Sequence, residues 1–168
     1  MKVKFKKLIE GAVLPKKATA GAAAYDLYVP QDTDIKPGRQ IIPLGFAMEM
    51  EPGYEALIDA RSGFSAKGME VYALLLEDKA VDIPEMISTK PIRIDCDVIQ
   101  GKIDSDYRGS VGVIIKNNEK RGINRLKAGT RIAQMTFHKV ETVEWEETDT
   151  LSETDRDGGF GSTGTGNE

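Results

Sequence analysis

Residues 101–109 combine the composition of a tight turn with several groups that could take part in catalysis. Two glycines bracket the carboxylates of Asp104 and Asp106, the phenol ring of Tyr107 and the guanidinium of Arg108. If this segment is extended, the two carboxylates share one face, where they could compete for one proton or order one water molecule. The ring of Tyr107 could pack on a sugar. An ordinary turn rich in Asp and Gly is the alternative.

The glycine-rich residues 156–168 have a composition that disfavours a packed core. Glycine loses the most backbone entropy on ordering, so we expect this tail to stay mobile until a ligand holds it. Its unhindered backbone N–H groups suit a polyphosphate, and its ring suits a nucleobase. A tail without function is the alternative. The side chains that would make these contacts are Arg156, Phe160, Ser162 and Thr163, with the backbone of Gly161 between them.

Two further segments could bind charged groups. Arg61, Ser62 and Gly63 follow the predicted strand 54–60, where a guanidinium, a hydroxyl and a flexible backbone N–H suit an anion. A solvated strand end is the alternative. Asp26 lies in an apolar and aromatic stretch, and a buried carboxylate needs a partner. That partner is either a structural ion pair or a hydrated metal.

A predicted strand over residues 129–135 carries one unexpected polar side chain. Alternation places Arg131 and Ala133 on one face of the strand, and Ile132 and Gln134 on the other. Because Gln134 then shares its face with an apolar residue, we expect it to have a hydrogen-bond partner.

The bulk composition of the chain narrows its class. With 168 residues, 40% of them hydrophobic, 17 glycines and 7 prolines, the chain suits one turn-rich domain. The 27 acidic and 23 basic residues are well mixed and leave a net charge of −4, so no basic stripe indicates stable nucleic-acid binding. No apolar run approaches a membrane span, and no secretory signal is evident. Cys96 and His138 each stand alone, which argues against internal disulfides, zinc sites and a Ser-His-Asp triad.

Short alternating segments separated by turn residues predict an all-β fold with at most one short helix. The predicted strands cover residues 2–6, 54–59, 111–116 and 131–140, and the nearest helical candidate covers residues 71–79. From about residue 141 the composition becomes polar, which predicts an arm that reaches across a surface, such as that of a neighbouring subunit.

The order of these segments resembles the five-motif signature of the trimeric dUTPases, the deoxyuridine triphosphatases. The resemblance runs from about residue 20 onwards through residues 24–28, 61–63, 101–109, 129–135 and 156–164. It implies a jelly-roll-like β-barrel over residues 1–148 and a flexible arm over residues 149–168 that closes the active site. It also implies a homotrimer with its active sites at subunit interfaces.

The activity implied by the resemblance is hydrolysis of dUTP to dUMP and pyrophosphate, which limits uracil incorporation into DNA and supplies dUMP for dTMP synthesis. Asp104 would activate a water molecule to attack the α-phosphorus. Tyr107 would stack on the deoxyribose and exclude ribose, while the backbone around residues 98–103, including Lys102 and Ile103, would read uracil. Asp26 would lie near Mg²⁺ and act on it through water. The phosphates and the base would be held by Arg61, Ser62, Gly63, Gln134, Arg156, Phe160, Gly161, Ser162 and Thr163.

The chain departs from the family pattern in an insertion at about residues 71–97, which is either a neutral loop elaboration or a docking surface for another protein. A related barrel enzyme, dCTP deaminase, and a non-enzymatic nucleotide-gated regulator are the competing interpretations. A P-loop NTPase is excluded, because no Gly-Lys-Ser/Thr follows a glycine-rich loop. The expected compartment is the cytoplasm, with the nucleus, an organelle or a host cytoplasm as alternatives that depend on the source.

Overall fold

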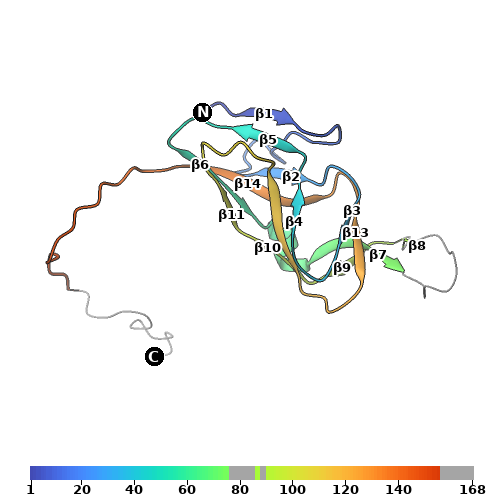
Figure 1. The fold of residues 1–168 in the computed structure, drawn as a ribbon. Helices are drawn as coiled ribbons and strands as arrows, with labels where there is room; N and C mark the ends of the chain where they lie inside the picture. Colours follow the sequence, from blue (N-terminus) through green and yellow to red (C-terminus); the bar gives the residue numbers. More distant parts are fainter. Residues whose placement is uncertain (76–85, 88–89, 156–168) are drawn as a thin grey trace.

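Antiparallel strands make up nearly all of the regular structure in the computed structural model, which describes residues 1–75, 86–87 and 90–155. They wrap around one core, and the C-terminal arm leads away from it (Figure 1). The single helix in the described part of the chain is α1 (Ser62–Lys67). This confirms the predicted all-β, jelly-roll-like fold with at most one short helix.

The strands are, in chain order, β1 (Lys4–Lys7), β2 (Tyr25–Tyr28), β3 (Thr33–Ile35), β4 (Gly38–Pro43), β5 (Phe46–Glu49), β6 (Tyr54–Asp59), β7 (Met69–Leu75), β8 (Met86–Ile87), β9 (Ile92–Ile94), β10 (Cys96–Ile99), β11 (Gly101–Ile103), β12 (Gly112–Asn117), β13 (Ile123–Leu126) and β14 (Arg131–Lys139). Within the described ranges they form four sheets, with the orders β1-β5, β10-β12-β4, β11-β6-β14-β2 and β3-β13-β7-β8, and β9 pairs with β7 as well.

Alternation of apolar and polar side chains explains the central strands. In β6, Ala56 and Ile58 are buried, and in β12, Val113 and Ile115 are buried, while their neighbours along each strand are less so. Such a pattern places every second side chain in the core. The strands predicted over residues 54–59, 111–116 and 131–140 are therefore confirmed, with boundaries within a residue or so.

The start of β14 departs from simple alternation. Its pairing with β2 shifts between Arg131 and Ala133, a β-bulge that turns both Ile132 and Ala133 into the core. After the bulge, Ala133 and Met135 are buried while Gln134 between them is not, so Met135 is in the core and Gln134 faces the other way. The prediction that Ile132 and Gln134 share a face is wrong, because the extra residue of the bulge reverses the alternation.

The helix predicted over residues 71–79 is also wrong where the structure describes it, since residues 71–75 belong to β7. This strand pairs with β13 on one side and with β9 on the other, and Met69 and Val71 are buried. Two partner strands outweigh a weak local preference for helix. The remainder of the predicted helix lies outside the described residues.

Helix α1 links β6 to β7 and ends at Gly68. The N–H of Gly68 donates to Phe64 O (2.9 Å), and its φ of 76° is a conformation that favours glycine. A Cβ atom here would also lie 2.5 Å from Ile94 O. Glycine therefore lets β9 cross directly beside the end of the helix.

The last strand leads directly into the arm. Val140 N–H donates to Gly53 O (2.9 Å), and beyond it the side chains of residues 141–155 are exposed, including Trp145 at 91%. Figure 1 shows this segment, orange to red, extending away from the sheets. Among the described residues, no helix is long and apolar enough to cross a membrane.

Candidate active site

A buried carboxylate on β2 organises one group of charged side chains. Asp26 is only 7% exposed, and Arg61 Nε donates to its Oδ1 (2.8 Å) while Arg131 Nη1 donates to its Oδ2 (3.1 Å). Two cations offset the cost of taking this charge out of water. The structural ion pair that the sequence allowed for Asp26 is present. Arg61 ends the extended backbone after β6, and Arg131 opens β14.

The two arginines also line a hollow of about 490 Å³ beside helix α1. Gly63 from the start of the helix, and Gly129 and Thr130 from the turn before β14, contribute to the same wall. Four cationic side chains and one carboxylate line it, namely Arg61, Lys67, Arg93, Arg131 and Glu70. This excess of positive charge, with glycine backbone alongside, suits an anion such as a phosphate chain.

Lys67, Glu70 and Arg93 are lining residues that sequence reasoning missed. Arg93 Nη2 donates to Glu70 Oε2 (3.2 Å), and Arg93 Nη1 donates to Gly68 O (3.3 Å). Lys67 has no hydrogen-bond or ion-pair partner within the described ranges. Its position four residues after Gly63 is a signal that could have been read, whereas Arg93 is brought in only by the pairing of β7 with β9.

Two of the predicted phosphate-binding residues stand beside the hollow rather than in its wall. Ser62 is exposed at the start of α1. Gln134 lies between Asp26 and Asp59 in the register of the sheet, on the face away from the core. The hydrogen-bond partner expected for Gln134 is not found among the residues that the structure describes.

The second group of predicted site residues follows β11. Asp104 is exposed directly after this strand, and Tyr107 N–H donates to Asp104 O (3.1 Å), which closes a turn. Arg108 Nη1 donates to Ser105 O (2.6 Å) and to Tyr107 O (3.0 Å), which holds the turn from outside. The segment is therefore not extended here, and the shared face conjectured for Asp104 and Asp106 is not formed.

The ring of Tyr107 is oriented by its own loop. Its hydroxyl donates to Ser110 O (3.0 Å), and a Cβ atom on Gly109 would lie 2.6 Å from its Cζ, so this close packing requires glycine. The ring is 44% exposed and lines a mainly apolar hollow of about 190 Å³ together with residues 101–103. Ile103 is buried in the same wall, while Lys102 Nζ is paired with Glu55 Oε2 (2.6 Å).

The two groups lie toward opposite ends of β6. The antiparallel register places Gly101 opposite Ile58 and Ile103 opposite Ala56, so the chain reaches Asp104 while moving away from Arg61. From Ala56 to Arg61 the backbone is extended, which at the usual rise per residue is about 16 Å. This separation is much longer than a triphosphate, and the two hollows share no lining residue.

Magnesium, implied by the resemblance, has one predicted contact in this region, Asp26. Both of its oxygens already accept hydrogen bonds from arginines, so a directly bound metal would share this carboxylate with two guanidinium groups and be repelled by their charge. No group of three or more His, Cys, Asp or Glu side chains in the described part of the chain could hold a metal ion. The donor set fits an indirect contact with the metal better than a direct one.

The predicted tail contacts, Arg156, Phe160, Gly161, Ser162 and Thr163, lie outside the described residues.

The only cysteine offers no nucleophile. Cys96 is buried beside β12, and burial, assisted by the charges of Asp97 and Asp95, raises the pKa of its thiol to about 12. The thiol therefore stays protonated near neutral pH. His138 is an exposed residue of β14, the strand position that the sequence predicts.

Comparison with known proteins identifies a single family. The sequence model of the dUTPase family matches residues 10–83 and 92–164. A deoxyuridine 5'-triphosphate nucleotidohydrolase of Gloeothece citriformis is 37% identical over 98% of this chain and 97% of its own length. The enzyme of the same name from monkeypox virus is 38% identical over 96% of this chain and 90% of its own length.

Solved structures agree with the fold. A Staphylococcus bacteriophage 80alpha dUTPase with dUpNHpp superposes with a TM-score of 0.74 at 23% identity, over 97% of this chain and 98% of that one. A phage phi11 dUTPase of S. aureus, described with a structural Mg(II) ion, gives a TM-score of 0.68 at 20% identity over 90% of this chain and 99% of its own. At such identities, these two structures show the common fold alone.

Proposed function

The chain belongs to the dUTPase family and is a dUTP diphosphatase, and we propose that it splits dUTP into dUMP and pyrophosphate with the two groups of residues described above. The observation that carries the proposal is that the two groups offer different chemistry. One group is a cationic hollow suited to phosphates, and the other is an exposed carboxylate beside a ring suited to a sugar. In a cell, this reaction would limit uracil incorporation into DNA and supply dUMP for dTMP synthesis.

Asp104 acts as the general base in this proposal. Its exposed carboxylate accepts a proton from a water molecule as the water oxygen forms a bond to the α-phosphorus. The bond from that phosphorus to the bridging oxygen breaks, and pyrophosphate leaves. The carboxylate stands at the end of a paired strand, with a turn held by Arg108, so its position is defined before substrate arrives.

Substrate selection follows from the hollow beside Tyr107. Its ring, fixed by Gly109 and Ser110, stacks on the deoxyribose and leaves no room for a 2′-hydroxyl. The backbone of residues 98–103, with Lys102 and Ile103, reads the uracil edge. Phosphates are held by Arg61, Ser62, Gly63 and Gln134, and the tail residues Arg156, Phe160, Gly161, Ser162 and Thr163 close over the γ-phosphate and the base.

A complete site needs more than one copy of the chain, because Asp104 and Arg61 of one copy are too far apart to serve one triphosphate. We propose a homotrimer in which residues 101–110 of one subunit, here called the hairpin, face the cationic hollow of another. The exposed arm, with the bare ring of Trp145, is available to cross a neighbouring surface. Light scattering that gives a monomer mass would contradict this arrangement.

Magnesium enters this proposal with the substrate. Bound to the triphosphate, Mg²⁺ would neutralise charge that develops on the phosphates during transfer. Asp26 supports it through water and holds Arg61 and Arg131 in place.

The expected compartment is the cytoplasm. Whether the insertion at residues 71–97 docks another protein stays a prediction, tested by deleting residues 78–90 and asking whether a partner is lost while activity persists.

The test of the reaction is a nucleotide panel. The protein is incubated with dUTP, dCTP, dTTP or UTP in Mg²⁺, and pyrophosphate release is followed, with Asp104→Asn alongside. We expect release from dUTP alone, and its loss in the variant. Near-normal kcat in Asp104→Asn would overturn the proposed role of Asp104. Conversion of dCTP to dUTP without pyrophosphate would instead indicate a deaminase.

A further inference from the structure

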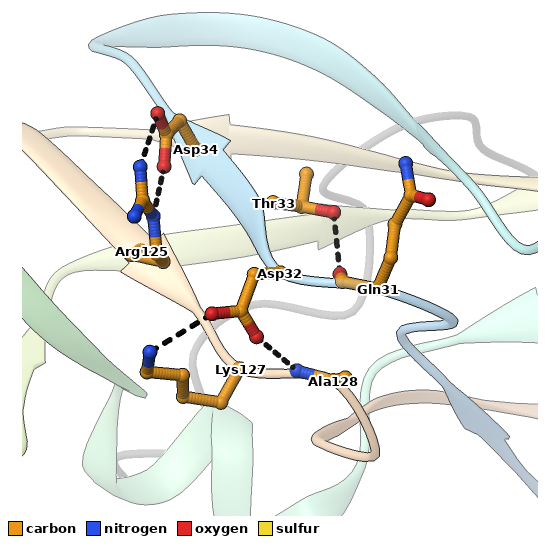
Figure 2. Close-up of polar contacts among 7 residues, drawn as sticks. All are labelled: Gln31, Asp32, Thr33, Asp34, Arg125, Lys127 and Ala128. Atoms are coloured by element: carbon orange, nitrogen blue, oxygen red, sulfur yellow. Dashed lines mark hydrogen bonds and ion pairs between the residues drawn. The ribbon is translucent and has the colours of Figure 1, made fainter. Parts of the chain in front are cut away.

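An exposed aspartate outside the cationic hollow holds one of its walls. Asp32, in the loop between β2 and β3, uses both carboxylate oxygens on the turn that follows β13: Oδ1 accepts the backbone N–H of Ala128 (2.9 Å), and Oδ2 accepts Lys127 Nζ (2.8 Å). Figure 2 shows the carboxylate lying between these two donors. The two contacts cross about a hundred residues of sequence, so they join separate parts of the chain.

The turn held by Asp32 is otherwise fastened by few bonds. Thr130 N–H donates to Lys127 O (3.1 Å), which closes the turn. Gly129 N–H donates to Val29 O (2.8 Å), and Val29 N–H donates to Thr130 O (2.9 Å), which ties its far side to the end of β2. Gly129 has a φ of 80°, a conformation that favours glycine. The near side of the turn, at Lys127 and Ala128, is the side that Asp32 secures.

This turn supplies Gly129, Thr130 and Arg131 to the cationic hollow. Asp32 itself lines no part of the hollow. We propose that Asp32 is a positioning residue for phosphate binding, because it sets where this turn presents its backbone and the Arg131 guanidinium. The inference rests on the proposed function, since it assigns the hollow to the phosphates of dUTP.

Asp34 provides a matched control in the same place. It lies on β3, two residues after Asp32, and binds Arg125 of β13 through two hydrogen bonds (2.6 and 3.0 Å). Both aspartates therefore tie the same pair of segments together with an exposed ion pair, as Figure 2 shows. Only Asp32 touches the turn that reaches the hollow, so a purely structural effect should appear equally in both variants.

The experiment compares Asp32→Ala, Asp32→Asn and Asp34→Ala with the wild-type chain. KM and kcat are measured for dUTP, the dissociation constant of dUpNHpp by calorimetry, and the thermal midpoint by circular dichroism. We expect Asp32→Ala to raise KM and the dissociation constant about five- to tenfold, the size of effect that one lost hydrogen bond produces, with kcat within about twofold. Asp32→Asn keeps an acceptor for Ala128 N–H and should lie between Asp32→Ala and wild type.

Asp34→Ala should lower the thermal midpoint and leave KM unchanged. If both aspartate variants shift KM equally, or if neither shifts it, Asp32 has no positioning role and the inference is overturned. Wild-type turnover separates this outcome from failure of the proposed function. An inactive wild-type chain that also fails to bind dUpNHpp would remove the premise itself.

Discussion

At the Arg61 end of β6, a carboxylate is buried and bonded by two arginines of its own chain, whereas Asp104, beyond the other end, stands exposed on a turn. The first group needs no neighbour to be held in place. The hairpin orders its turn and its tyrosine ring, but leaves its carboxylate without a side-chain partner in the described part of the chain.

The difference indicates how a site can be divided between copies of one chain. Binding groups that must be desolvated together are assembled within a subunit, where buried charges find their partners during folding. In the proposed trimer, the carboxylate of Asp104 would stay free until another subunit brings the phosphates to it. Four predictions test this division, beginning with the one of largest effect.

If the proposed site is shared between subunits, mixing two inactive variants should restore activity. Asp104→Asn should lower kcat by about 10²- to 10⁴-fold, the usual contribution of a general base. Arg61→Gln should lower kcat/KM by about 10²-fold or more through loss of a phosphate contact. When the two are unfolded together and refolded in equal amounts, about a quarter of the sites combine an intact hairpin with an intact hollow, so about a quarter of wild-type activity should return.

Each variant refolded alone is the control for that mixture. A mixture no more active than its components would mean that both groups act within one chain. The shared site proposed here would then be wrong.

Removing the buried carboxylate of Asp26 should lower the stability of the fold more than removing the exposed carboxylate of Asp106. Asp26→Asn leaves two guanidinium groups facing each other without their counter-charge, and we expect a loss of about 2 kcal/mol in the free energy of unfolding. Asp106→Asn, on the exposed turn, should change it by less than about 0.5 kcal/mol. Urea denaturation measures both. Equal losses in the free energy of unfolding of the two variants would contradict the expected difference between the two ends of β6.

A smaller effect is expected at the edge of the hollow. Arg93→Gln removes one of its four cations and should raise KM for dUTP about two- to threefold, because a partly exposed charge contributes modestly. Because Asp104 is untouched, kcat should be unchanged. Arg121→Gln, an exposed arginine that does not line the hollow, is the matched control. An unchanged KM in Arg93→Gln would exclude Arg93 from the binding group and leave Arg61, Lys67 and Arg131.

The smallest effect concerns a surface ion pair, Asp34 with Arg125, that lines neither hollow. The Arg125 guanidinium holds the pKa of Asp34 below its ordinary value of 3.8, so the folded state keeps this carboxylate ionised at pH values where the unfolded chain binds a proton. The pair stabilises the fold above that ordinary pKa, and its contribution disappears as pH falls through the lower folded-state pKa. Asp34→Asn should cost about 0.5–1 kcal/mol at neutral pH and nothing in strong acid. A difference that grows on acidification would contradict this.

Sequence patterns were reliable where the signal was local. The alternating residues 54–59 predicted β6 to the residue, and the ordered motifs pointed to Arg61 and Gly63, which line the cationic hollow, and to Tyr107, which lines the hollow beside β11. The patterns failed where a partner strand decides the conformation. Residues 71–75 form a strand because they pair with β13, β8 and, at Val71, β9, and the bulge at Ile132 exists only in register with β2.

The sequence by itself determined an all-β chain, because alternation and turn residues act over a few positions. Its ordered motifs predicted Asp104, Tyr107, Arg61 and Asp26 as site residues. Only the tertiary structure decided that Asp26 pairs with arginines 35 and 105 residues away, and that Asp104 points to the opposite end of β6. Strand order and register set these distances, and both depend on how distant segments share one core, which no local pattern encodes.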